Sequence, residues 1–225
     1  MSAEQVARVR AWHERAYRRG SAGEQSITYL GRSLVIPRGV MPITAVSELL
    51  GRAVLNDVRD GDRVLDMGTG SGVNAILAAS RAGSVLAVDI NPDAVTAAED
   101  NVRRNGVADR VEVRRSDVFD EVDGAFDLIV FDPPFRWFAR RDRFETAITD
   151  ENYEALTRFF RDAREHLTEG GRMLIFFGTS GDLAYLERLA DAAGFARTVV
   201  ARETIRQDDW QVEYFTFRMT LGHAS

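Results

Sequence analysis

Apolar and polar positions along this chain change their pattern near residue 60. Before that point, residues 4–19 predict a charged amphipathic helix, residues 28–36 a short hairpin, residues 37–42 a stiff connector and residues 44–55 a second helix. After it, short apolar runs alternate with helical patterns, which is typical of a parallel sheet with helices on both faces. The expected strands are 63–67, 84–89, 111–115, 127–132, 171–178, 195–202 and 210–219, and the expected helices lie near 73–82, 92–105, 151–167 and 182–193.

This alternation predicts a doubly wound, mostly parallel, seven-stranded α/β fold. No helix separates the last two expected strands, so we expect the last strand to run antiparallel to its neighbours. The chain should divide into a helix-and-hairpin extension over residues 1–43 and a main domain over residues 44–225.

The composition narrows the classes of protein to consider. With 45% hydrophobic and 28% charged residues, the chain resembles soluble globular proteins. No apolar run reaches the roughly 18 residues that a membrane span needs, so no membrane partner is expected. The first 20 residues have no apolar core and do not predict a secretory signal, which favours the cytoplasm. A net charge of −6 argues against a broad basic surface for nucleic acid, but it does not exclude a local basic patch.

Metal chemistry is not expected. The chain has no cysteine, and its three histidines (His13, His166 and His223) are scattered without metal-ligand spacing. All 29 basic residues are arginine, which we interpret mainly as a codon bias, so a single arginine is weak evidence for phosphate binding.

A glycine-rich turn follows the first strand of the main domain. Asp66 ends the apolar run, and Gly68-Thr69-Gly70 opens into a further glycine and an apolar helix. Glycines allow the backbone to turn sharply and to approach a ligand closely. The dinucleotide-binding pattern would need a third glycine at position 73, where this chain has Val73, so the spacing disfavours a nicotinamide dehydrogenase.

A carboxylate also ends the second expected strand, and another follows the third. Asp89 is placed to accept both hydroxyls of a ribose, with an ordinary surface aspartate as the alternative. Asp117 is placed to accept the exocyclic amino group of an adenine, with an exposed turn residue as the alternative. Ile90 and Val118 would offer apolar faces to the ring.

The fourth strand ends in Asp132-Pro133-Pro134-Phe135. The two prolines stiffen the backbone and remove two donors, so carbonyl groups stay free to accept hydrogen bonds. If Asp132 and the Pro133 carbonyl each accept one N–H, a planar nitrogen is held with its lone pair aimed at a methyl group, and Phe135 can stack on the planar group. This would be catalysis by orientation and electrostatic stabilisation.

These motifs resemble the class I S-adenosylmethionine-dependent methyltransferases. Within them, the Asp-Pro-Pro-Phe loop is similar to the HemK-like glutamine methyltransferases, the small-domain RNA methyltransferases and the DNA adenine methyltransferases. The resemblance spans roughly residues 35–220 and implies S-adenosylmethionine as cofactor. It implies methionine contacts at Asp66, Gly68, Thr69 and Gly70, adenosine contacts at Asp89, Ile90, Asp117 and Val118, and catalytic roles for Asp132, Pro133, Pro134 and Phe135. HemK-like proteins have asparagine and tyrosine where this chain has Asp132 and Phe135.

The resemblance implies an enzyme that methylates an amide or exocyclic amino nitrogen of RNA, a protein glutamine or a small molecule. A non-catalytic subunit or sensor that binds S-adenosylmethionine is the alternative. The segment after the proline motif mixes arginine with aromatic residues, from Arg136 to Arg143, and would suit phosphates and stacked bases. A solvated loop is the alternative for that segment.

Overall fold

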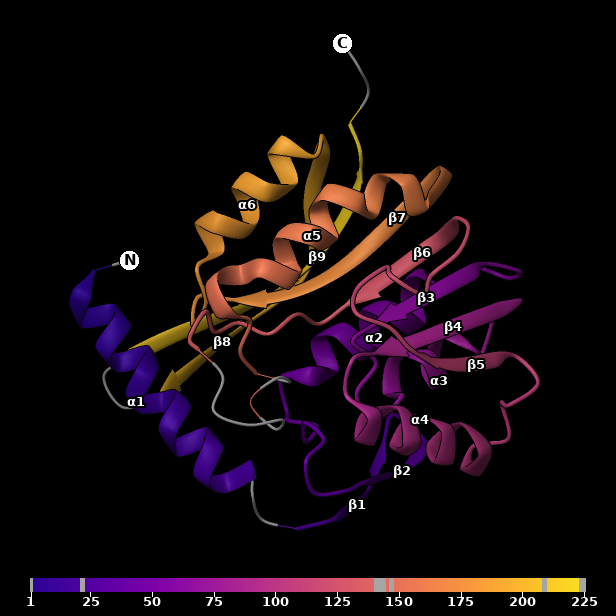
Figure 1. Cartoon of the computed structure of the whole chain (residues 1–225), viewed down its shortest axis with the longest axis horizontal. Helices are drawn as coiled ribbons and strands as arrows, with labels where there is room; N and C mark the ends of the chain where they lie inside the picture. Colours follow the sequence, from indigo (N-terminus) through magenta and orange to yellow (C-terminus); the bar gives the residue numbers. More distant parts are fainter. Residues whose placement is uncertain (1, 21–22, 140–144, 146–147, 208–209, 223–225) are drawn as a thin grey trace.

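A seven-stranded sheet forms the centre of the computed structural model, which describes residues 2–20, 23–139, 145, 148–207 and 210–222 (Figure 1). The strand order is β5-β4-β3-β6-β7-β9-β8. The strands are β3 (Arg63–Met67), β4 (Ser84–Asp89), β5 (Val111–Arg115), β6 (Phe126–Phe131), β7 (Leu167–Gly178), β8 (Phe195–Gln207) and β9 (Trp210–Leu221). The strands from β5 to β7 are parallel, and β9 is antiparallel to both of its neighbours. The mostly parallel sheet with an antiparallel last strand is therefore confirmed.

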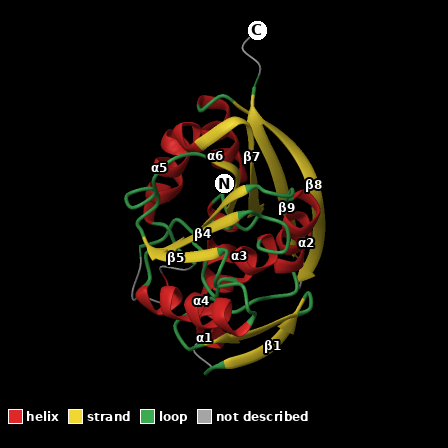
Figure 2. Ribbon diagram, turned by 90° about the vertical axis from the view of Figure 1, so that its right-hand side faces the viewer, coloured by secondary structure: helices red, strands yellow, loops and turns green. Residues whose placement is uncertain are grey.

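Helices cover both faces of this sheet, as Figures 1 and 2 show. One face carries α2 (Ser47–Asp57), α3 (Val73–Ala78) and α4 (Pro92–Arg104), and the other carries α5 (Glu154–Asp162) and α6 (Leu183–Ala192). Side chains of a strand alternate between the two faces. In β3, Val64 packs into the core under α2 and α3, whereas Leu65 and Met67 pack into the core under α5 and α6.

The N-terminal part consists of α1 (Ala3–Gly20) and a hairpin of β1 (Gln25–Tyr29) and β2 (Arg32–Ile36). The side chain of Asn101 on α4 accepts from the backbone N–H of Val35 at 2.8 Å and donates to its carbonyl at 2.9 Å. Leu34 and Tyr29 belong to the same core as α2 and α3. The hairpin is thus fastened to the main domain, and the division at residue 43 stays a prediction.

Several boundaries differ from those expected. Helix α3 ends at Ala78 because the N–H groups of Ser80 and Arg81 bond carbonyls three residues back, which tightens the last turn. The expected helix 151–167 is three pieces: η2 (Glu151–Tyr153), α5 and η3 (Ala163–His166). Asn152 and Tyr153 have positive φ and break it. Strand β8 extends to Gln207, beyond the expected end, along the antiparallel ladder with β9.

A buried arginine ties several of these elements together. Arg172 of β7 is 2% exposed and pairs with Asp57 at the end of α2 (3.2 Å) and with Asp62 before β3 (2.7 Å). It also donates to the carbonyl of Asp127 at 2.8 Å. Arg218 of β9 makes a further ion pair with Asp57. This network fastens the ends of β3, β6, β7 and β9 that lie away from the glycine loop.

We expect Arg172→Met to lower the free energy of unfolding by about 3–5 kcal/mol, because Asp57 and Asp62 would stay buried without their main cation. Equilibrium urea denaturation measures this change. Arg52→Met is the matched control, since Arg52 is exposed and pairs with Glu48 one turn away, and it should cost no more than about 0.5 kcal/mol. Equal effects of the two substitutions would contradict the assigned role of the network.

Candidate functional site

Carboxylates that follow neighbouring strands meet at one edge of the sheet. Asp66 of β3 lies level with Ala87 of β4 and with Val130 of β6, so Asp89 and Asp132 each lie two residues beyond it, on either side. Two strand spacings place these two backbones about 10 Å apart. The chain runs outward from β3 through β4 to β5 and then returns to β6, so the strand order reverses here. Such a switch point is where open α/β sheets bind ligands.

Asp66 closes the glycine-rich loop from beneath. It is 1% exposed, and its Oδ2 accepts hydrogen bonds from the hydroxyl of Thr69 (2.5 Å) and the backbone N–H of Ala75 (3.0 Å). Burial raises the pKa of Asp66 to about 7, against the lowering effect of these two bonds. The buried side chains of Asp66 and Thr69 therefore shape the loop, and its backbone is the surface that remains for a ligand.

The loop can take this path because of its glycines. Gly68 and Gly70 have φ of +65° and +56°, values that a side chain disfavours. A Cβ placed on Gly70 would meet no atom within 4 Å, so the space beside this backbone is open. The backbone N–H of Gly70 donates to Oδ2 of Asp89 at 2.9 Å. The loop is thus held from both sides, by Asp66 below and by Asp89 at the end of β4.

Asp89 keeps binding capacity beyond its internal bonds. Oδ1 accepts from the N–H of Asn91 at 2.9 Å and Oδ2 from that of Gly70, and the backbone N–H of Ile90 also bonds the carboxylate. A carboxylate has about four acceptor positions, so acceptor capacity remains for a ligand. Burial raises the pKa of Asp89, and the backbone bonds oppose this shift. Ile90 beside it is 37% exposed, unusual for a large apolar residue, so the two side chains present a carboxylate next to an apolar surface.

Asp117 and Val118 lie beyond β5, but contacts within the protein already use part of their binding capacity. Asp117 forms an ion pair with Arg158 of α5, a residue that the sequence did not single out. Val118 is buried and has φ of +53°, with its carbonyl bonded by the hydroxyl of Ser116 at 2.8 Å. An adenine amino group would therefore need a lone pair of Asp117 that Arg158 does not use. Little of the Val118 side chain is accessible to a ligand.

Asp132 differs from Asp66, Asp89 and Asp117 because its carboxylate has no hydrogen bond or ion pair with any described residue. Among the described residues nothing donates a hydrogen bond to its carboxylate or to the carbonyl of Pro133. Its side chain is exposed to solvent, yet the surrounding protein desolvates it and Asp66 repels it, which together raise its pKa to about 7. Asp132 is therefore an accessible carboxylate in poorly hydrated surroundings.

The rest of the proline motif is held by distant parts of the chain. The carbonyl of Phe135 accepts a hydrogen bond from the hydroxyl of Tyr153 at 2.8 Å. The Tyr153 hydroxyl oxygen in turn accepts one from the backbone N–H of Asp182. The Phe135 ring is half-buried against Phe177 (4.9 Å between centroids), Phe176 and Tyr214, so only part of it can stack on a ligand.

Two tyrosines missed by the sequence analysis stand near Asp132. Burial raises the pKa of Tyr29 and of Tyr214, and the negative charge of Asp132 contributes to both shifts. Tyr29 comes from the hairpin and Tyr214 from β9, so both ends of the chain contribute to this side of the site. No local signal could reveal them, because each reaches the site only through tertiary packing.

The arginine-rich segment is described only in part. Arg140, Arg141 and Arg143 lie outside the described residues. Arg136 is buried rather than solvated, so the alternative of a solvated loop is wrong for this residue. Its Nη1 donates to the carbonyl (2.8 Å) and hydroxyl (3.1 Å) of Ser180.

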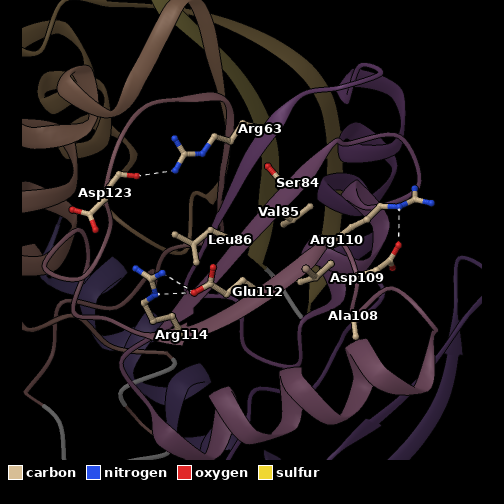
Figure 3. A pocket seen from close by; sticks show the side chains of 11 residues that line it. Arg63, Ser84, Val85, Leu86, Ala108, Asp109, Arg110, Glu112, Arg114 and Asp123 are labelled. Atoms are coloured by element: carbon tan, nitrogen blue, oxygen red, sulfur yellow. Dashed lines mark hydrogen bonds and ion pairs between the residues drawn. The ribbon is translucent and has the colours of Figure 1, made fainter.

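A polar recess lies elsewhere, near the amino ends of β4 and β5. It has a volume of about 590 Å³ and is lined by Arg63, Glu112, Arg114 and other polar residues (Figure 3). Its arginines are engaged, since Arg114 pairs with Glu112 at 2.6 Å and Arg63 donates to the carbonyl of Asp123 at 3.0 Å. Within the described part of the chain, no cluster of potential metal ligands occurs and no helix is long and apolar enough to cross a membrane. The candidate site is therefore the one at the carboxyl ends of β3, β4 and β6, where Asp66, Asp89 and Asp132 lie.

Known proteins match most of the chain. Residues 43–206 match the family model described as methyltransferase small domain. The ribosomal protein L11 methyltransferase of Bacillus cytotoxicus is 32% identical over 191 residues, which are 84% of this chain and 53% of that protein. The chain thus spans about half the length of the curated relatives that it matches.

Solved structures give the same picture of the fold. The ribosomal protein L11 methylase of Lactobacillus delbrueckii subsp. bulgaricus has a TM-score of 0.60 and 25% identity, with 84% of each chain covered. The tRNA m1G37 methyltransferase of M. jannaschii has a TM-score of 0.68 with 17% identity, and the match covers 89% of this chain and 57% of that one. The second likeness concerns the fold alone.

The buried Asp66 should make stability depend on pH. Because its pKa is about 7 in the folded protein, the folded state keeps a proton between about pH 4 and 7 that the unfolded chain has released, so stability falls as pH rises through this window. Asp66→Asn should flatten this slope, since one amide oxygen can accept both hydrogen bonds and does not ionise. Urea unfolding from pH 4.5 to 7.5 tests it, with the exposed Asp109→Asn as control. Coinciding slopes for Asp66→Asn and the wild type would rule the buried proton out.

Proposed function

The chain belongs to the methyltransferase small domain family, and we propose that it transfers a methyl group from S-adenosylmethionine to an amide or exocyclic amino nitrogen of RNA, a protein or a small molecule. The observation that carries the proposal is Asp132, an accessible carboxylate without a partner among the described residues, next to a proline carbonyl that is also free to accept.

S-adenosylmethionine is the cofactor expected of this family, and the residues at the switch point fit it. When bound, it supplies an electrophilic methyl group carried on a positively charged sulfur. Asp89 retains acceptor capacity for ribose hydroxyls, and the exposed Ile90 offers an apolar surface beside it. The open space beside Gly70 lets a ligand approach the loop backbone closely.

Asp132 and the Pro133 carbonyl would orient the acceptor. An amide or aromatic amine nitrogen is a poor nucleophile, because its lone pair is delocalised. Two acceptors that each take one N–H hold this nitrogen with its lone pair turned toward the methyl group, and the carboxylate stabilises the positive charge that develops on the nitrogen. The rigid prolines and the Tyr153 bond to Phe135 keep these acceptors in place.

A non-catalytic subunit or sensor that binds S-adenosylmethionine remains the second candidate. It would use the loop and Asp89 but would have no need of a desolvated, unpaired carboxylate at Asp132, which is costly to keep. A cytoplasmic location is part of the proposal, and the curated relative named for a ribosomal protein is consistent with it.

We expect Asp89→Ala to weaken S-adenosylmethionine binding by about 1.5–3 kcal/mol, because the ribose hydroxyls lose a charged acceptor. Isothermal titration measures the affinity, and Asp109→Ala, which removes an exposed carboxylate away from the site, serves as control. Affinity within about twofold of the wild type would show that Asp89 does not hold the ribose.

We expect Asp132→Ala to bind S-adenosylmethionine nearly as the wild type does, while turnover falls by about 10²–10³, the loss typical of one positioned electrostatic partner. Turnover is measured as the transfer of tritium from labelled cofactor to fractionated cell extract, a readout that does not require the acceptor to be identified first. The fraction that takes up label also identifies RNA, protein or small molecules as the acceptor class.

Asp132→Asn is the matched variant, since its amide oxygen can still accept a hydrogen bond and its loss should be smaller. Wild-type turnover should rise as pH increases through about 7, where the Asp132 carboxyl ionises, and Asp132→Asn should lack this rise. Loss of cofactor binding in both variants would instead make Asp132 a cofactor ligand. Unchanged methylation in both would end the claim of nitrogen methylation.

A further inference from the structure

Arg136 is a buried cation without a counterion among the described residues. Its side chain is 9% exposed, and it takes part in none of the ion pairs among the described residues. Nη1 makes both of its hydrogen bonds to Ser180. Nε is fully buried and has no partner, and no described residue accepts from Nη2 either. The Nε–Nη2 edge of the guanidinium, which can bind carboxylates and phosphates through two parallel bonds, therefore has no hydrogen-bond partner in the part of the chain that the structure describes.

The other deeply buried arginine shows what a structural cation looks like in this protein. Arg172 is paired with Asp57 and Asp62 and bonded to backbone carbonyls as well. A buried guanidinium without such partners is destabilising unless a ligand supplies the missing charge. Burial lowers the pKa of Arg136 to about 10, so the group is still a cation at neutral pH.

Arg136 adjoins the acceptor side of the site. Ser180, which accepts from Arg136, is also hydrogen-bonded to Tyr214. Burial raises the pKa of Tyr214, and the negative charge of Asp132 adds to this shift. The guanidinium carbon lies 6.0 Å from the centre of the Phe135 ring and 5.1 Å from that of Trp12. Arg136 thus lies beside Phe135 of the proline motif and is linked through Ser180 to Tyr214.

We propose that the Nε–Nη2 edge of Arg136 binds a single carboxylate or phosphate group of a small methyl acceptor whose nitrogen lies at Asp132. The inference rests on the proposed function for the identity of that ligand as the acceptor. A guanidinium walled by Trp12 and Phe135, on a chain of net charge −6, suits one isolated anion. A nucleic-acid backbone would instead call for several exposed cations along a track.

Anion binding can be measured without the acceptor and without turnover. Sodium phosphate and sodium acetate, each from 1 to 100 mM at constant ionic strength, are titrated into the full chain while thermal unfolding is followed. We expect one of the two anions to raise the midpoint saturably, which identifies the class of oxyanion. In Arg136→Met its affinity should fall by about tenfold or more, as for the loss of a charged hydrogen-bonded pair. Arg136→Lys, which lacks the two-pronged edge, should be weakened as well.

Arg52→Met, which removes an exposed arginine, should bind the anion as the wild type does. Equal responses of wild type and Arg136→Met, or no response of the wild type to either anion, would overturn the proposal. Tight binding of an RNA oligonucleotide that requires Arg136 would also overturn it in favour of a nucleic-acid acceptor. Asp132→Ala should keep the anion response, so failure of methyl transfer and failure of this site are separable.

The stability of Arg136→Met without added anion excludes a purely structural role. Removing an unpaired buried charge should offset much of the loss of the two hydrogen bonds to Ser180, so the free energy of unfolding should change far less than in Arg172→Met. A loss as large as that of Arg172→Met would show that Arg136 serves the fold and would contradict the binding role.

Discussion

The site depends on one buried carboxylate at the centre of the sheet. Asp66 stands where β3 ends, and a single oxygen of its side chain bonds Thr69 inside the glycine-rich turn and Ala75 in α3. With both groups tied to one point, the chain between them has to fold back sharply, which Gly70 and Gly72 permit at positive φ. The same fold directs the N–H of Gly70 to Asp89. The two hydrogen bonds offset part of the free-energy cost of burying Asp66, and they hold the loop in one conformation.

Three carboxyl groups gather at this edge of the sheet. Burial raises the pKa of Asp66, Asp89 and Asp132, and among the described residues no cation pairs with any of the three. Ionised carboxylates in such surroundings favour a positively charged ligand over a neutral one of the same shape. On the acceptor side the charge is positive at Arg136, which has no carboxylate partner among the residues that the structure describes. The site therefore offers opposite charges to two different ligands.

The cofactor side and the acceptor side are built in different ways. Short segments that follow β3, β4 and β5 form the cofactor side, so the conformation of each motif is set mainly by nearby residues. The second needs contributions from distant elements: Tyr153 before α5, Tyr214 of β9 and Tyr29 of the hairpin. Helix α1 joins them, since Trp12 packs on Trp210 and His13 bonds Glu145 at 2.8 Å. The acceptor side thus depends on both ends of the chain.

The sequence alone determined the sheet, the turn and the row of carboxylates, because periodicity, glycine spacing and strand ends are local properties that parallel strands carry to one edge. It determined the order of the elements but not the breaks at Asn152 and Tyr153, where positive φ interrupts an apparently helical pattern. Only the tertiary structure decided that Asp117 pairs with Arg158, that Asp132 has no partner among the described residues and that Arg136 is buried. Burial and pairing depend on residues far apart in the chain, and no local pattern records which of them meet.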